Sequence, residues 1–105
     1  MATIELERPA EALPELDEVS IVLLGAARIV RERWQQYRRG EFGEPRCARG
    51  ALQEVASTWS QGIQAADRVS RSLGLGGDYL ASWNDAPDRT AEEVAEAMER
   101  AAYGL

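Results

Sequence analysis

The run from Glu18 to Arg39 constrains the fold most, because its apolar side chains recur with the period of an α-helix. At about 100° per residue they fall within one broad half of a helical wheel. This apolar set consists of Val19, Val22, Leu23, Ala26, Ala27, Ile29, Val30, Trp34 and Tyr37. Asp17 stands directly before the run and suits an N-cap. The pattern predicts an amphipathic helix of about six turns.

Two apolar residues break this pattern. Ile21 and Leu24 fall among the polar positions of the wheel, where a solvent-facing helix carries charged side chains. An exposed apolar patch usually marks a contact surface. We therefore expect either the leucines of the amino-terminal segment or a second copy of the chain to cover Ile21 and Leu24.

Three shorter helical patterns follow, over residues 46–58, 61–73 and 90–103, with a short helical turn at 79–83. A loop with glycine and proline at residues 40–45 precedes the first of them, and the glycine run at 74–77 ends the second. No stretch shows the alternation of a strand. The expected inward faces are formed by Cys47, Ala48, Ala51, Leu52, Val55 and Trp59, by Ile63, Ala66, Val69 and Leu73, and by Val94, Ala97, Met98, Ala101 and Ala102.

The first sixteen residues contain two prolines and no sustained helical period. We interpret 1–16 as an extended amino-terminal arm and 17–105 as a single helical domain. The fold class is all-α, a compact bundle of about four helices with the first helix as its spine.

The composition excludes several kinds of chemistry. The chain has no histidine and one cysteine, so a zinc site and a histidine-dependent catalytic triad are excluded. All twelve basic residues are arginine, which also excludes a catalytic lysine and a P-loop lysine. The sequence favours a protein that is not an enzyme and that uses no metal and no cofactor.

Location is indicated by Cys47 and by the lack of a long apolar run. A single thiol forms no internal disulfide and fits a reducing compartment. The longest apolar run, residues 21–27, is far short of the ~20 residues that span a bilayer. The amino end begins with acidic residues rather than with an export signal. We expect a cytoplasmic protein without membrane contact.

Charge is segregated along the chain. Residues 28–71 contain nine arginines and five acids, whereas the segments on either side are acidic. Arg31, Arg38 and Arg39 form the basic end of the first helix, interleaved with Trp34 and Tyr37. Arginines among aromatic side chains are typical of surfaces that bind nucleic acid. One alternative is therefore that these arginines serve nucleic-acid-associated regulation. The other is that they form a solvated surface whose charge is balanced by the acidic ends of the chain.

The stretch SWNDAPDRTAEEV, residues 82–94, is the most distinctive in the chain. Thr90 and Glu93 form the pattern of a capping box at the start of the last helix. Trp83, Asn84 and Asp85 precede it, and amide and carboxylate side chains often bond neighbouring backbone groups at a turn. We interpret these three as a structural corner, with the Trp83 indole donating to a carbonyl. A ligand or enzyme site using Asp85 remains the further alternative.

These segments resemble an uncharacterised family, a domain of unknown function found in small proteins of actinobacteria and their phages. The resemblance rests on the C-x-x-G-A-L segment at residues 47–52 and the W-N-D-x-P-x-R-T-x-x-E-V segment at 83–94. The family pattern usually has glycine where Asp88 stands, and it often has a glycine-bearing hairpin where this chain has QQYRRGEFGEPR. The resemblance implies the helical fold and no particular activity.

The function that follows from these observations is a small protein-interaction module. It would dock on a protein partner or associate with itself, and a homodimer is the simplest form. The expected contact residues are Ile21, Leu24, Arg31, Arg38 and Arg39.

Overall fold

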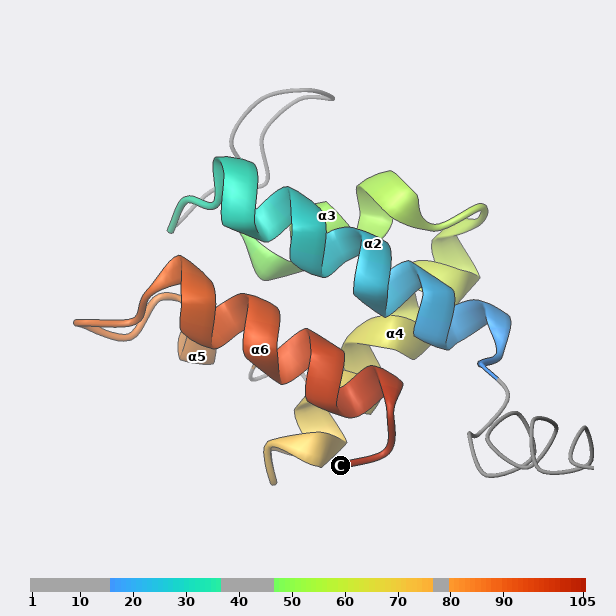
Figure 1. Cartoon of the computed structure of the whole chain (residues 1–105). Coiled ribbons are helices and arrows are strands. Elements are labelled where there is room, and N and C mark those ends of the chain that lie inside the picture. The colour runs from blue at the N-terminus through green and yellow to red at the C-terminus, as the bar shows by residue number, and fades with distance from the viewer. Residues whose placement is uncertain (1–15, 37–46, 77–79) are drawn as a thin grey trace, which may run out of the picture.

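The structure, a computed structural model, describes residues 16–36, 47–76 and 80–105. The regular elements in these ranges are helices, which confirms the all-α class (Figure 1). There are five of them rather than about four, because the expected turn before the closing motif is a helix in its own right. They are α2 (Glu18–Arg33), α3 (Ala48–Val55), α4 (Trp59–Ser72), α5 (Leu80–Asn84) and α6 (Ala91–Ala102). Residues 1–15 of the expected arm lie outside the described ranges.

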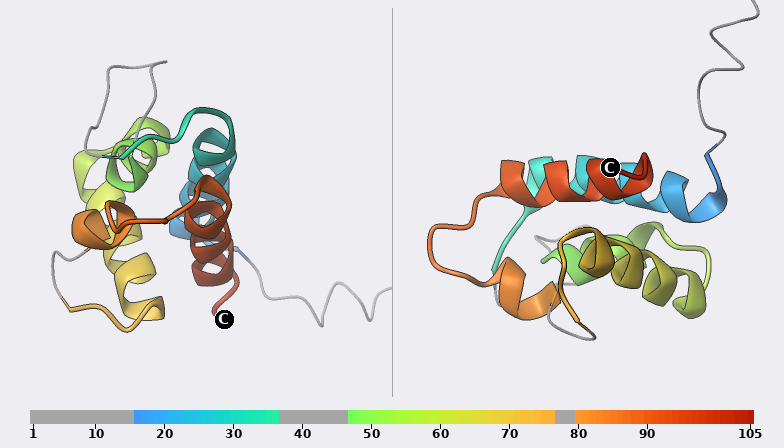
Figure 2. Two further views of the ribbon diagram at one scale, coloured as in Figure 1. Left: turned by 90° about the vertical axis from the view of Figure 1, so that its left-hand side faces the viewer. Right: turned by 90° about the horizontal axis from the view of Figure 1, so that it is seen from below.

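The helices form two layers. Helices α2 and α6 run side by side in opposite directions, and α3, α4 and α5 form the layer beneath them (Figure 2). Apolar side chains from all five helices fill the space between the layers. The largest of the fully buried apolar side chains are Leu23, Leu52, Leu80, Met98, Val30, Val69 and Val94. This arrangement makes α2 the spine, as its apolar periodicity predicts.

Helix α2 begins as expected and ends six residues early. The Asp17 carboxylate accepts from the Ser20 N–H at 2.8 Å, which confirms the N-cap. At Trp34, however, the backbone is extended, with ψ of 144°. The helix ends there because the Trp34 indole donates to the Asn84 side chain at the end of α5, and the Gln36 amide donates to the carbonyls of Asn84 and Ala86. Residues 37–39, also expected in this helix, lie outside the described part of the chain.

The expected inward faces of the second and third helices need correction at Trp59 and Ile63. Trp59 is 61% exposed and Ile63 is 38% exposed. The chain is extended at Ala56, and the Thr58 hydroxyl then caps α4 by accepting from the Gln61 N–H. The helical period of α3 therefore does not continue to Trp59, which begins a separate helix. The buried side of α4 is formed by Val69, as expected, together with Gly62, Ala65 and Ser70.

Local capping sets both ends of the later helices. Thr90 and Glu93 exchange the two hydrogen bonds of a capping box, at 3.1 Å and 3.0 Å. Helix α4 closes with Gly74 in the left-handed region, and α6 closes in the same way with Gly104, both at a φ of 76°. In each case the two residues after the helix donate back to its last turn. These ends confirm the predicted start of α6 and the predicted ends of α4 and α6. Helix α4 begins at Trp59 rather than near residue 61, and α3 covers 48–55 rather than 46–58.

Candidate interaction surface

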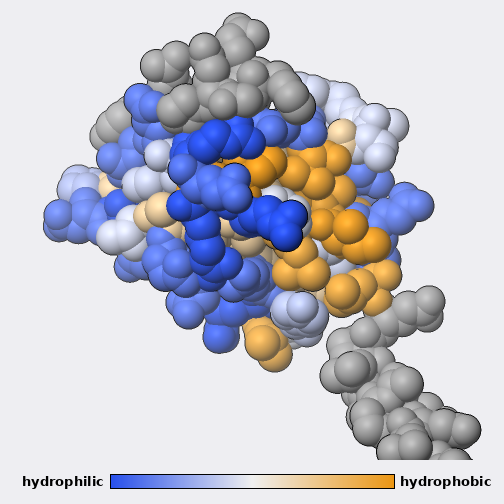
Figure 3. Space-filling model, turned by 45° about the horizontal axis from the view of Figure 1, so that its top comes forward, coloured by the Kyte–Doolittle hydropathy of each residue, from blue (hydrophilic) through white to orange (hydrophobic). Residues whose placement is uncertain are grey.

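The outer face of α2 carries the apolar residues that the wheel placed among polar positions. Ile21 is 57% exposed, and Leu24 is partly buried against the core. Figure 3 shows hydrophobic surface gathered on the side of the molecule that α2 occupies. Side chains of the size of isoleucine seldom stay this open without a contact role when they form part of a patch.

Val55 at the end of α3 extends this apolar surface. It lines, with Ile21, a shallow hollow of 250 Å³. Gly25 allows the two helices to approach here, because a Cβ at that position would lie 3.0 Å from a Val55 methyl carbon. We call Ile21, Leu24, Gly25 and Val55 the apolar strip. The sequence did not identify Val55 as a surface residue. Its helical position predicts an inward side chain, but it lies at the edge of the core and is only partly buried.

Opposite charges flank the apolar strip along α2. Glu18 lies one turn before Ile21, and its carboxylate accepts from the Gln61 side chain at 3.2 Å. Arg28 lies one turn after Leu24 and is exposed. The Arg28 side chain makes no hydrogen bond or ion pair with a residue of the described ranges. Glu32, also exposed, lies one turn after Arg28 on the same face. The strip is therefore flanked by an acid at one end and by an arginine and an acid at the other.

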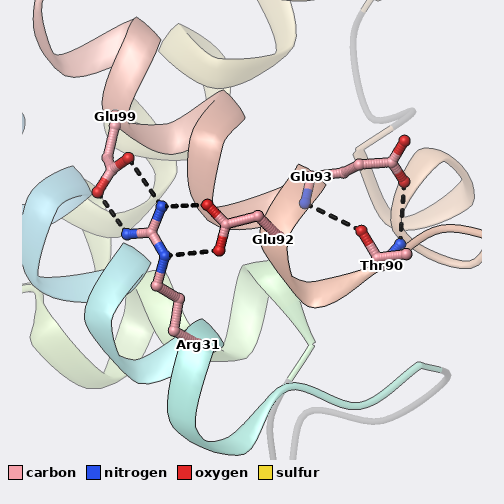
Figure 4. A network of polar contacts seen from close by, with 5 residues as sticks. All are labelled: Arg31, Thr90, Glu92, Glu93 and Glu99. Carbon is pink, nitrogen blue, oxygen red and sulfur yellow. Dashed lines mark hydrogen bonds and ion pairs between the residues drawn. The ribbon is translucent and has the colours of Figure 1, made fainter.

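Arg31, an expected partner-binding residue, is held within the chain. Its guanidinium lies between two carboxylates of α6, with Nε 2.9 Å from Glu92 and Nη2 2.7 Å from the same carboxylate. Glu99 accepts from the other side, at 3.0 Å from Nη2 (Figure 4). Hydrogen bonding to Arg31 lowers the pKa of both glutamates and raises the pKa of the arginine. Two acids of α6 thus fix the guanidinium of Arg31 between the two helices.

The other arginines at the end of α2 are placed differently. Arg33 pairs with Glu54 of α3 at 2.9 Å. In the last turn of α2, Arg31 thus pairs with α6 and Arg33 pairs with α3. Arg38 and Arg39, the other expected contact residues, lie outside the described ranges.

Asn84 is the centre of the Trp83, Asn84 and Asp85 corner and is 0% exposed. Its Oδ1 atom accepts from the Trp34 indole N–H at 2.6 Å and from the Ala48 backbone N–H at 3.1 Å. The second bond satisfies a free N–H at the start of α3, where Cys47 provides no side-chain cap. Its amide nitrogen donates to Asp85 at 2.9 Å. Asn84 therefore ties α2, α3 and α5 together, in a structural role.

Trp83 and Arg89 complete this corner. The Arg89 guanidinium carbon lies 4.0 Å from the centre of the Trp83 ring, and Arg89 Nε donates to the Trp83 carbonyl at 2.9 Å. The indole of Trp34, rather than that of Trp83, provides the tryptophan hydrogen bond of the corner. Asp88 adopts a φ of 70°, as glycine does readily. These contacts and the conformation of Asp88 form the turn that connects α5 to α6.

A second open hollow, of 530 Å³, lies at the ends of α4 and α6. Its polar wall contains Arg68, which donates to Asp17 at 2.9 Å and to Ser20 at 2.9 Å. Ser20 in turn donates to the Ala102 carbonyl at 3.0 Å. Hydrogen bonding from Arg68, and then from the Ser20 N–H, lowers the pKa of Asp17. The polar groups are engaged with each other, so this hollow offers a ligand less than the apolar strip does.

Two further searches bear on function. Among residues 16–36, 47–76 and 80–105, no group of three or more histidine, cysteine, aspartate or glutamate side chains lies close enough to hold a metal ion. No helix within those ranges combines the length and the apolar character that crossing a bilayer requires.

Comparisons with known proteins give one result. Searches of curated proteins and of solved structures each found no match. A family described as a family of unknown function, DUF6197, matches residues 14–103, which include the five helices described above. The chain therefore belongs to this family of unknown function.

Proposed function

We propose that this protein is a small, non-enzymatic interaction module that docks on another polypeptide through the apolar strip. The observation that carries the proposal is Ile21, which is 57% exposed on a helix whose other large apolar side chains are buried or partly buried. Leu24 and Val55 enlarge the apolar area beside it. Contiguous exposed apolar surface favours protein contact over contact with a phosphate backbone.

The charges near the strip support the same choice. The guanidinium groups of Arg31 and Arg33 are engaged by Glu92, Glu99 and Glu54. A nucleic-acid surface at this end of α2 would need those groups to meet phosphates. The single cysteine and the family resemblance support a cytoplasmic protein of an actinobacterium or its phage.

The proposal can be tested with a photo-crosslinking amino acid at position 28, beside the strip. Position 100 on α6 is the matched control, because Arg28 and Arg100 are both exposed arginines. We expect a discrete protein adduct from position 28 in cells, and none from position 100. The adduct should disappear when Ile21→Glu is added, while circular dichroism of that variant stays unchanged. Equal adducts from both positions, or an adduct that survives Ile21→Glu, would contradict the proposal.

A further inference from the structure

The hollow at the ends of α4 and α6 has an apolar lining that no described residue covers. Its polar side chains bond one another, as the contacts of Arg68 with Asp17 and Ser20 show, so the surface left for an occupant is mainly apolar. This apolar lining consists of Leu16, Ala101, Ala102, Tyr103 and Leu105. Within it, Tyr103 is 49% exposed and Leu105 is 67% exposed.

Backbone bonds hold these two exposed side chains at the rim of the hollow. The Tyr103 N–H donates to the Glu99 carbonyl at 3.2 Å. The Leu105 N–H donates to the Arg100 carbonyl at 2.8 Å, and the Leu105 carbonyl accepts from the Ser72 hydroxyl of α4 at 3.1 Å. Large apolar side chains that are held open beside one another usually mark a contact.

We propose that the amino-terminal segment of this chain, residues 1–15, docks into this hollow with Leu13 against Tyr103 and Leu105. The first described residue, Leu16, lines the hollow, so the segment begins at its rim. Leu13 stands three residues earlier, a stretch of chain that spans at most about 10 Å. A leucine tethered this closely is present at a high effective concentration. The hollow is a different surface from the apolar strip, so this inference does not depend on the proposed function.

The sequence of the segment suits this contact. Leu13 precedes Pro14, and a following proline favours an extended backbone. The segment carries four glutamates and one arginine, so acids in the hollow would repel it. The acid of the described lining, Asp17, is paired with Arg68 at 2.9 Å. The segment therefore meets no unpaired acidic side chain in that lining.

Paramagnetic broadening of amide signals in nuclear magnetic resonance spectra tests the contact. A nitroxide label on Ala12→Cys places the probe beside Leu13, and Cys47→Ala removes the native thiol, whose side chain makes no cap bond. We expect a loss of amide signal concentrated at residues 68–72 and 101–105. Adding Leu13→Glu should restore these signals. Leu13→Met should not restore them, because methionine is an apolar side chain of similar volume.

Tyr103→Ser provides the reciprocal test from the side of the hollow. It removes an exposed apolar side chain of the rim, so it should restore the signals as Leu13→Glu does. Trp59→Ser is the matched control, because Trp59 is an aromatic residue, 61% exposed, that does not line the hollow. In the Trp59→Ser variant the signals should stay broadened. Circular dichroism should be unchanged in both variants.

The outcomes separate this inference from the proposed function. Signal loss at the hollow that both Leu13→Glu and Tyr103→Ser reverse supports the docking. Signal loss centred on the apolar strip would place the segment there, which overturns this inference and the proposed function together. Equal loss on both sides of Leu16, or loss at the hollow that survives both substitutions, overturns this inference and leaves the proposed function intact.

Discussion

The indole Nε1 atom of Trp34 donates to the Oδ1 atom of Asn84 across 2.6 Å, although 50 residues separate the two side chains. This bond explains the end of α2, because Trp34 leaves the helical path to make it. The same oxygen caps α3 through the Ala48 N–H. One buried amide thus fixes the end of one helix and the beginning of another.

Asn84→Ala should strongly destabilise the fold. It removes the acceptor of one buried and one partly buried N–H group, and leaving such donors unsatisfied costs roughly 3 kcal/mol in total. Urea denaturation followed by circular dichroism measures the change in the free energy of unfolding. Asp85→Asn serves as the control, because asparagine still offers Asn84 an acceptor, and we expect a loss of about 1 kcal/mol or less. Similar losses in both variants would show that Asn84 has no special role.

Local chemistry explains what the sequence predicted correctly. The caps at Asp17 and Thr90, and the stop at Gly74, depend on residues within a few positions of each other. Their geometry is therefore encoded in short motifs. The exposure of Ile21 also followed from the wheel, because the first part of α2 is a regular helix.

Tertiary contacts explain what could not be predicted. The wheel extended α2 through Trp34 because nothing in residues 18–39 signals the distant Asn84. Trp59 was expected in the core because one helical period was extended from the second helix to residue 59. The chain is in fact extended at Ala56 and Thr58, and no glycine or proline in this segment signals the break. The acids that hold Arg31 lie 61 and 68 residues away, so charge spacing alone gave no sign of them.

Arg31→Gln should reduce the acid sensitivity of the fold. Bonding to Arg31 lowers the pKa of Glu92 and Glu99 in the folded chain. A lowered folded pKa contributes stability above the unfolded pKa of about 4.3, and this contribution is lost as the pH falls through the folded pKa. Between pH 6 and pH 3 the original chain should therefore lose more stability than Arg31→Gln does. Thermal melts at both pH values measure the difference.

Glu96→Gln is the matched control for this pH experiment, because Glu96 is an exposed acid of the same helix. Its acid sensitivity should equal that of the original chain. The difference between the original chain and Arg31→Gln at pH 6 should also shrink in 1 M salt, where the screening length is about 3 Å. Identical pH profiles for the original chain and Arg31→Gln would rule out a contribution from the Arg31 contacts.

Thr90→Ala should weaken the start of α6. The hydroxyl accepts from the Glu93 N–H at 3.1 Å, and losing an N-cap of this kind costs about 1 kcal/mol. Thr90→Ser keeps the hydroxyl and should stay within about 0.5 kcal/mol of the original chain. Urea midpoints distinguish the two variants. Equal midpoints would mean that the Glu93 side chain alone holds this helix end.

Asp88→Gly should stabilise the protein. Asp88 has a φ of 70°, and Arg89 N–H donates to the Ala86 carbonyl at 3.1 Å, which closes a turn with Pro87 and Asp88 at its centre. The second central residue of such a turn favours glycine, because a Cβ in the left-handed region is strained. The gain from relieving that strain exceeds the added freedom of glycine in the unfolded chain, so we expect about 0.5 kcal/mol of net stabilisation. Asp88→Ala should change stability in the opposite direction, since alanine lacks the side-chain hydrogen bonding that helps aspartate tolerate this conformation. Thermal denaturation of the two variants tests this opposition, and a lower melting temperature for Asp88→Gly than for Asp88→Ala would show that backbone strain at this turn does not limit stability.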